Sequence, residues 1–268
     1  MSKTKLIATN PRLDYFQNDV YSISNTEASL KTHYSQTTLD NDPIVFTIYA
    51  GRNESINFSQ HFLKLKVRIV KANGDPIEAA FNNHFALVNN SLHALFKHVV
   101  VEMEGIKITN AVDIYHIKSY IDALFSASKN NLNTLEMQGF FPDEGAAPQT
   151  FVADDTNPSL HKRAQMARQS REFELFGPLY IDFFKNNKNV HSNTRIDIKL
   201  FRNDPAFYIW RDEHNAGNED NPNILGDLKC EIREAHFLVR HEKHLDSIVN
   251  SIEKTLMTGK NIVTRQQL

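Results

Sequence analysis

Histidines are the first candidates for chemistry, because the 268-residue sequence contains 12 of them. Three of these, His236, His241 and His244, lie close together near the end of an apolar segment. A metal site needs three or four ligands that converge on one point. In a strand, positions 236 and 241 have opposite parity, so their side chains should point to opposite faces. We therefore expect surface or interface histidines here, and the same for His93 and His98 at a predicted helix-to-strand boundary.

Two pairs of neighbouring acids could hold calcium or supply a general acid: Asp143 with Glu144, and Asp154 with Asp155. No third oxygen ligand that would converge on either pair is visible in the sequence, so solvated loop charge is the expected role. Cys230 is the one cysteine, and it lies among apolar residues of the same strand parity. It is expected to be a small core residue rather than a nucleophile, and an internal disulfide is impossible.

One basic cluster consists of His161, Lys162 and Arg163, followed by Arg168 and Arg171. It has no interleaved aromatic residues, and the whole chain has a net charge of -2. Proteins that bind nucleic acid usually have a basic excess, because they neutralise phosphates. A subunit contact or a solvated helix face is therefore expected, and no specific nucleic-acid binding.

Motifs of the common enzyme classes do not occur. The sequence has no Gly-rich phosphate loop, no HExxH and no GxSxG. We predict no catalytic, cofactor-binding or metal-binding residue, and no cofactor.

Alternation of apolar and polar residues dominates the elements that must position these side chains. The clearest predicted strand is 62–70, in which leucine, valine and isoleucine point to one face and lysine and arginine to the other. In the segment 228–240 the apolar residues change parity, which predicts a β-bulge near Glu234. Further strands are predicted at 44–49 (buried on both faces), 98–104, 173–176, 179–184 and 195–201. The residues expected in the core are Leu65, Val67, Ile198 and Phe237.

Helical spacing occurs in two stretches. The first, 113–125, has a stripe of Ile114, Ile117, Ile121, Leu124 and Phe125. The second, 243–257, has a stripe of Leu245, Ile248, Val249, Ile252 and Leu256, and Gly259 can terminate it. Weaker helix candidates are 87–96 and 159–169, and long contact loops are expected at 129–158 and 203–226.

The composition is that of a globular chain that can bury a core, with 41% hydrophobic and 23% charged residues. Residues 1–28 are polar and are expected to form an N-terminal arm. Lysines near the N-terminus are not followed by an apolar run, so no secretory signal is predicted. No stretch approaches the roughly 18 apolar residues of a membrane span. Many short strands with few helices in insertions predict an all-β antiparallel sandwich.

A series of short motifs carries a resemblance to a known family. The most specific is V-N-N-x-L-H-x-L-F at 88–96, followed by Tyr115 and by Y-I-x-x-L at 120–124. Further matching segments are PIVFTI at 43–48, FLKLKVRI at 62–69, FELFGPL at 173–179 and RIDIKL at 195–200. In order and spacing these segments resemble the major capsid proteins of Polintons (Mavericks) and the related adintoviruses.

The resemblance implies a double jelly roll, in which two eight-stranded sandwiches lie side by side and three copies form a pseudo-hexagonal tile of an icosahedral shell. Residues 29–242 would be the first jelly roll. Residues 243–268 would be a connector helix and linker toward a second jelly roll that this sequence lacks. The implied partners are copies of the chain itself, within the homotrimer and between capsomers, and a minor (penton) capsid protein. The implied location is the virion, assembled inside the host cell, and no enzymatic activity is implied.

Two other functions remain open at this point. A host could have kept such a jelly roll as a binding module for another partner. A cupin-like enzyme would need a closely spaced His-x-His and an inward carboxylate, and the sequence has no His-x-His. In the capsid interpretation, the helix at 243–257 should pack only partly on its own domain, so its remaining apolar surface would favour association.

Overall fold

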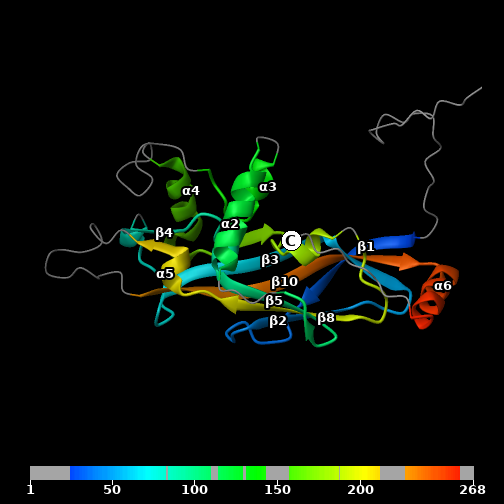
Figure 1. The fold of residues 1–268 in the computed structure, drawn as a ribbon. Helices are drawn as coiled ribbons and strands as arrows, with labels where there is room; N and C mark the ends of the chain where they lie inside the picture. Colours follow the sequence, from blue (N-terminus) through cyan, green and yellow to red (C-terminus); the bar gives the residue numbers. More distant parts are fainter. Residues whose placement is uncertain are drawn as a thin grey trace, which may run out of the picture.

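The computed structural model describes residues 25–82, 84–109, 114–128, 131–142, 157–186, 188–211 and 227–259. These residues form two four-stranded antiparallel sheets stacked on one another, with a small two-stranded sheet at one end (Figure 1). None of the described helices is both long enough and apolar enough to cross a membrane.

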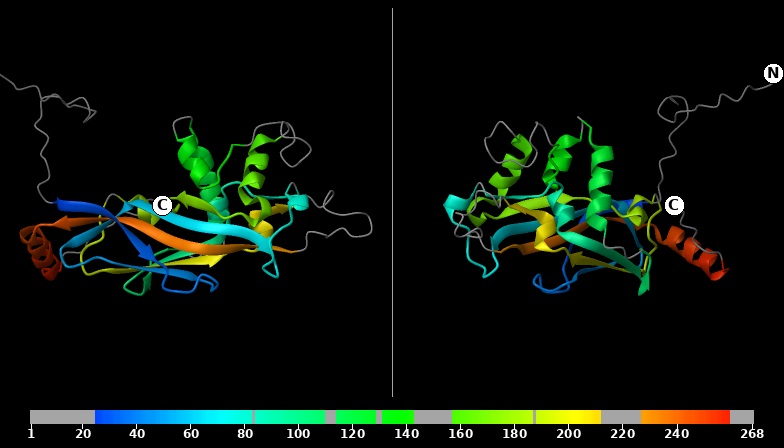
Figure 2. Two further views of the ribbon diagram at one scale, coloured as in Figure 1. Left: turned by 180° about the vertical axis from the view of Figure 1, so that it is seen from behind. Right: turned by 60° about the vertical axis from the view of Figure 1, so that its left-hand side comes forward.

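The strands are β1 (Asn25–Tyr34), β2 (Ile44–Tyr49), β3 (Glu54–Lys71), β4 (Phe85–Leu87), β5 (Phe96–Met103), β6 (Ile106–Lys107), β7 (Phe173–Gly177), β8 (Arg195–Arg202), β9 (Ile209–Arg211) and β10 (Leu228–His244). The helices are α1 (Ser91–Ala94), α2 (Tyr115–Ser126), α3 (Leu132–Met137), α4 (Pro158–Ala167), α5 (Pro205–Tyr208) and α6 (Asp246–Met257). Helices α2, α3 and α4 all belong to the connection between β6 and β7, and they stand over the same side of the sandwich (Figure 2).

The strand pairing is nested. β1 pairs with β10, β2 with β8, β3 with β7 and β5 with β6, all antiparallel. Contacts of β10 with β3, and of β8 with β5, join these pairs into the sheets β1-β10-β3-β7 and β2-β8-β5-β6. Pairing the first strand with the last is what results when one long antiparallel ribbon rolls around a core, which is the jelly roll. The predicted antiparallel jelly-roll sandwich is confirmed.

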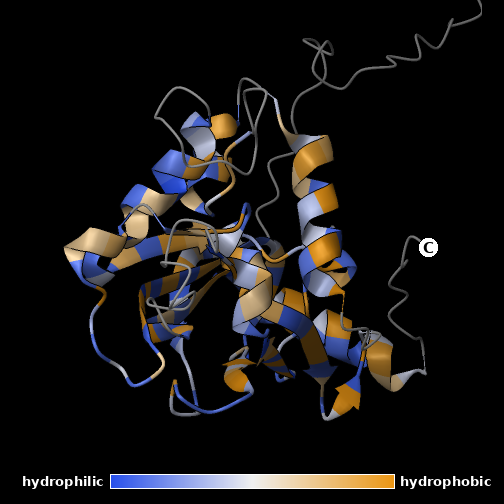
Figure 3. Ribbon diagram, turned by 90° about the vertical axis from the view of Figure 1, so that its left-hand side faces the viewer, coloured by the Kyte–Doolittle hydropathy of each residue, from blue (hydrophilic) through white to orange (hydrophobic). Residues whose placement is uncertain are grey.

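The core lies between the two sheets and follows the predicted alternation. Leu65, Val67, Ile198 and Phe237 are all fully buried, as predicted. Figure 3 shows hydrophobic and hydrophilic residues alternating along the strands. The register of β10 against β3 shifts between Ile232 and Glu234, which confirms the predicted bulge. The bulge returns the later apolar residues of β10 to the buried face.

The segment 179–184 is not a strand, and this prediction was wrong. Its second half is a short 3-10 helix, Asp182–Lys185. The backbone N–H of Leu179 donates to His61 Nε2 at 2.8 Å, so a distant side chain takes the place of a strand neighbour.

Three further predictions need correction. The expected loop 129–158 contains α3, and the expected loop 203–226 contains α5 and β9. Residues 129–130, 143–156 and 212–226 of these expected loops lie outside the described residues. β2 is an edge strand, buried on one face only. Its even-numbered residues are buried, whereas Tyr49 is 55% exposed.

The expected segment boundaries shift by a few residues. Residues 25–28 of the expected arm begin β1, which pairs with the end of β10. Residues 1–24 of the expected arm lie outside the described residues. Lys243 and His244 still belong to β10, so the predicted helix at 243–257 begins only at Asp246.

Candidate functional site

The three clustered histidines near the end of β10 point to different partners. The ring of His236 packs edge-on against Tyr34, with centroids 5.1 Å apart. His244 Nε2 lies 2.6 Å from the hydroxyl of Ser55. The ring of His241 is buried and contacts His33, so the expectation of a surface or interface role was wrong for His241. Within the described ranges, no group of three or more histidine, cysteine or acidic side chains is placed to hold a metal ion.

His241 belongs instead to a polar cluster between β1, β3 and β10. Its Nε2 lies 3.1 Å from Nε2 of His33, so one ring donates and the other accepts. Its Nδ1 lies 3.2 Å from Glu54, which also accepts from Lys31 Nζ at 2.7 Å. Burial lowers the pKa of His33 to about 4, and His241 and Lys31 add to this effect. The sequence alone does not reveal this cluster, because its members lie on strands far apart in the chain.

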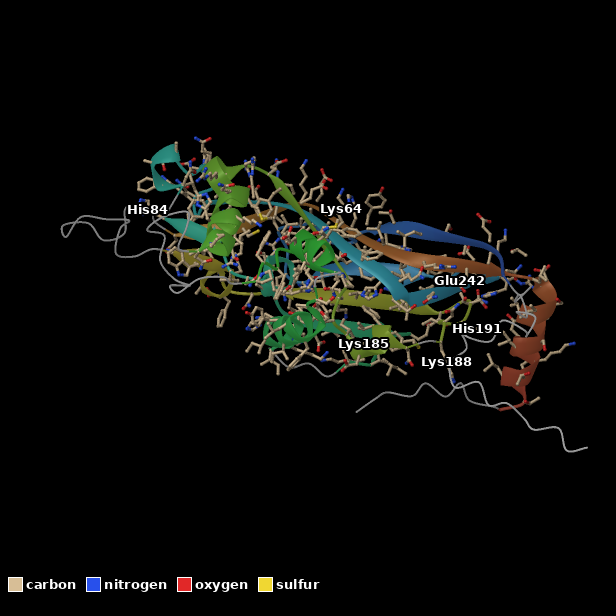
Figure 4. All side chains as sticks on the ribbon, turned by 90° about the horizontal axis from the view of Figure 1, so that it is seen from above. Lys64, His84, Lys185, Lys188, His191 and Glu242 are labelled. Carbon is tan, nitrogen blue, oxygen red and sulfur yellow. The ribbon has the colours of Figure 1, made fainter. Side chains whose placement is uncertain are left out.

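The same end of the sandwich has a second polar network around Glu242. The carboxylate of Glu242 accepts from Asn189 Nδ2 at 2.8 Å and from Asn57 Nδ2 at 3.2 Å. Arg240 lies 3.0 Å from the same carboxylate. Figure 4 shows Glu242 and His191 toward the end that carries α6. These contacts tie β10, β3 and the segment before β8 together, which is a structural role.

His93 and His98 also have structural surroundings. His93 is fully buried, with Nδ1 2.9 Å from the hydroxyl of Tyr115 and Nε2 3.3 Å from the side-chain oxygen of Gln138. Burial lowers the pKa of His93 to about 4 and raises the pKa of Tyr115. The ring of His98 packs against Phe201 at 4.8 Å. The expectation of a surface or interface role was therefore wrong for His93, which joins α1 to α2.

Cys230 is a buried free thiol, as predicted, and burial raises its pKa to about 12. At neutral pH it is therefore protonated and unsuited to act as a nucleophile. The acidic pairs at 143–144 and 154–155 lie outside the described residues.

Three members of the basic cluster make contacts within the chain, and one of them, Arg163, is buried. Arg163 is 4% exposed, and its Nε donates to the carbonyl of Leu87 at 3.0 Å. Lys162 lies over the ring of Phe141, 5.7 Å from its centroid. Arg171 Nη2 donates to the carbonyl of Gln165 at 2.9 Å. These contacts hold α4 and the turn after it in place.

Apolar side chains on α2 are the most distinctive surface feature. The predicted stripe faces away from the sheets, with exposed fractions of 51% for Ile114, 50% for Ile117, 44% for Ile121, 52% for Leu124 and 85% for Phe125. A stripe of this kind on a surface helix usually faces the core. Its outward direction indicates a surface for contact with another molecule.

Helix α6 has a second exposed apolar surface. Val249 is its one buried residue, whereas Leu245 and Ile252 are each 40% exposed and Met257 is 85% exposed. The prediction that this helix packs only partly on its own domain is confirmed.

Comparisons with known proteins give matches among solved structures. Neither a protein-family model nor a curated protein matches the sequence. A chain in the cryo-EM structure of the Sputnik virophage matches 88% of this chain with a TM-score of 0.57 and 12% identity. The Faustovirus major capsid protein matches 90% of it with a TM-score of 0.53 and 9% identity.

This chain spans about half the length of the solved chains that it matches, 52% of the virophage chain and 58% of the Faustovirus protein. At identities this low the likeness concerns the fold. The described chain has the jelly-roll fold found in a viral major capsid protein.

Proposed function

We propose that this chain is a structural protein that builds a viral capsid. The observation that supports this most is the nested jelly-roll pairing, matched over 88% to 90% of the chain by the virophage chain and the Faustovirus protein. The exposed apolar residues of α2 and α6 add support, because a shell subunit needs surfaces that become buried on assembly. The proposal assigns no catalytic, cofactor-binding or metal-binding role to any residue.

The proposed assembly is a trimeric, pseudo-hexagonal capsomer of an icosahedral shell. Each subunit would contribute two jelly rolls, and residues 29–242 would be the first. Helix α6 would be the connector, with its exposed Ile252 and Met257 packed against the second sandwich. The proposed lineage is that of the Polinton and adintovirus capsid proteins, on the motif resemblance described above.

The partners in this proposal are copies of the chain and a minor capsid protein at the five-fold positions. The proposed location is the virion, with assembly inside the host cell. Specific nucleic-acid binding is not part of the proposal. In support, Arg163 and Lys162 of the basic cluster make contacts within the chain, to Leu87 and Phe141.

Light scattering on purified protein tests the proposal. The 268-residue chain would be compared with a longer version that includes the sequence encoded downstream. We expect the short chain to associate or to be poorly soluble, and the longer one to have the mass of three subunits. A short chain that stays monomeric at high concentration, beside a longer one that forms no trimer, would favour a host-domesticated binding module.

A further inference from the structure

One face of helix α2 packs against the rest of the domain, and the opposite face is exposed to solvent. Ser119 and Ala123 are fully buried, and Tyr115 is 7% exposed. The hydroxyl of Ser119 accepts from Asn90 Nδ2 at 3.3 Å, and Ala123 packs with Leu135 in a small apolar cluster. The inner face therefore has mostly small side chains, and the large apolar ones lie on the outer face. The domain itself fixes the direction in which the stripe points.

The spacing of the outer residues is that of a helix–helix seam. Ile114, Ile117, Ile121 and Leu124 follow one another by three, four and three positions, which corresponds to the a and d positions of a heptad. In the same heptad the inner residues 115, 119 and 123 occupy positions b, f and c, on the side away from a seam. These four residues form a line along the helix that suits another helix with the same pattern, and the fifth residue of the stripe, Phe125, lies beside this line at position e.

The charged residues beside the stripe neutralise one another. Lys118 Nζ lies 3.3 Å from Asp122 and 3.0 Å from Asp182. Lys185, labelled in Figure 4, lies 3.2 Å from Asp122. Two positive and two negative groups thus form one balanced cluster, which would not repel an identical copy. A strongly charged partner such as nucleic acid would find no complementary charge in this cluster.

We propose that α2 is a self-association seam, in which three copies of this chain bring their α2 helices together around a three-fold axis. Three of the four seam residues are isoleucines, present at both a and d positions, and this choice favours three or four strands over two. An isolated helix of 12 residues is only marginally stable in water, so each α2 must be held in place by the jelly roll to which it belongs. The inference rests on the proposed trimeric capsomer and names the surface that would hold it together.

The substitution Ile121→Asp tests the inference. Ile121→Asp would place three unpaired carboxylates, one from each subunit, in a single layer of the seam, and burying such charges is strongly unfavourable. We expect association to weaken by more than about 100-fold, so that light scattering gives the mass of one subunit at concentrations where the unchanged protein is trimeric. The matched control is Leu30→Asp on β1, because Leu30 has a similar exposure of 48%. Both variants should keep the circular dichroism spectrum of the parent, because both sites are exposed in the single chain.

Cysteine cross-linking supplies a second measurement. Cys230 is buried, so a cysteine introduced as Ile121→Cys would be the reactive thiol. Mild oxidation of the trimer should link two of the three subunits covalently, and Leu30→Cys should give no such product.

The outcomes separate the two proposals. If the Ile121→Asp variant is still trimeric and the Ile121→Cys variant gives no cross-link, the α2 seam is wrong. The proposed capsid function would not be affected by that result. If the unchanged protein forms no trimer in either the short or the longer version, both proposals fail.

Discussion

Phe237 offers the sharpest test of how the two sheets are held together. It is fully buried on β10, a central strand of its sheet. Its ring lies 5.9 Å from Phe46 on β2 of the opposite sheet, 5.9 Å from His61 and 6.3 Å from Phe184. Phe237→Ala would leave a cavity between two hydrogen-bonded sheets that cannot easily collapse. Such truncations cost about 3–5 kcal/mol, a large part of the roughly 5–15 kcal/mol that stabilises a typical domain.

Urea unfolding followed by circular dichroism measures this loss. The control is Leu30→Ala, because Leu30 is 48% exposed on an edge strand. A surface change of this kind should alter the free energy of unfolding by no more than about 0.5 kcal/mol. A loss below about 1 kcal/mol for Phe237→Ala would refute the assignment of this ring to the contact between the sheets.

Three further predictions concern the pH dependence of stability, the substitution of two glycines, and the metal content of the purified protein. Burial lowers the pKa of His61 and His93 to about 4. The folded protein therefore keeps both rings neutral while the unfolded chain gains protons below about pH 6.5. The free energy of unfolding should fall by about 2 kcal/mol per ring between pH 7 and pH 5. In urea titrations, the free energy of unfolding of His93→Gln should depend less steeply on pH than that of the unchanged protein. The same pH dependence in both proteins would contradict this prediction. Gly139→Ala should destabilise more than Gly74→Ala in thermal melts. Both glycines have positive φ, but a Cβ at Gly139 would lie 2.7 Å from Ser91 Oγ, whereas a Cβ at Gly74 would meet no atom within 4 Å. Equal decreases in melting temperature for the two variants would refute the close approach of Ser91 to Gly139. Elemental analysis of untagged protein should find no stoichiometric zinc, iron or manganese, and a metal held by His236, His241 or His244 would disprove the metal-free account.

The sequence predicts the strands well where one face is buried and the other is wet. In β3 the lysines and arginine alternate with fully buried leucine and valine, so pattern and structure agree. The parity change in β10 was enough to locate the bulge at 232–234. These features depend on local periodicity, which a single sequence displays directly.

The errors arise where distant residues determine the local structure. The segment 179–184 has a strand-like pattern, yet His61, 118 positions earlier, accepts from the N–H of Leu179. β4 and β9 form their own small sheet although more than a hundred residues separate them, and neither strand was predicted. For α2, the spacing gave the helix and its stripe. It did not show that the small residues Ser119 and Ala123 would face the domain.

The cluster of His33, Glu54 and His241 illustrates the same limit for candidate sites. Its three members come from β1, β3 and β10, and only the strand register brings them together. The sequence placed His241 in a histidine-rich segment near the end of a strand. The residues that surround it could be identified only from the fold.

Electron microscopy of the purified, longer protein would show whether the chain builds a trimeric capsomer. We expect class averages with three-fold symmetry and a pseudo-hexagonal outline, in which α2 of each subunit lies at a contact between copies. Single particles with the mass and size of one subunit, with no three-fold class at any concentration, would contradict this expectation.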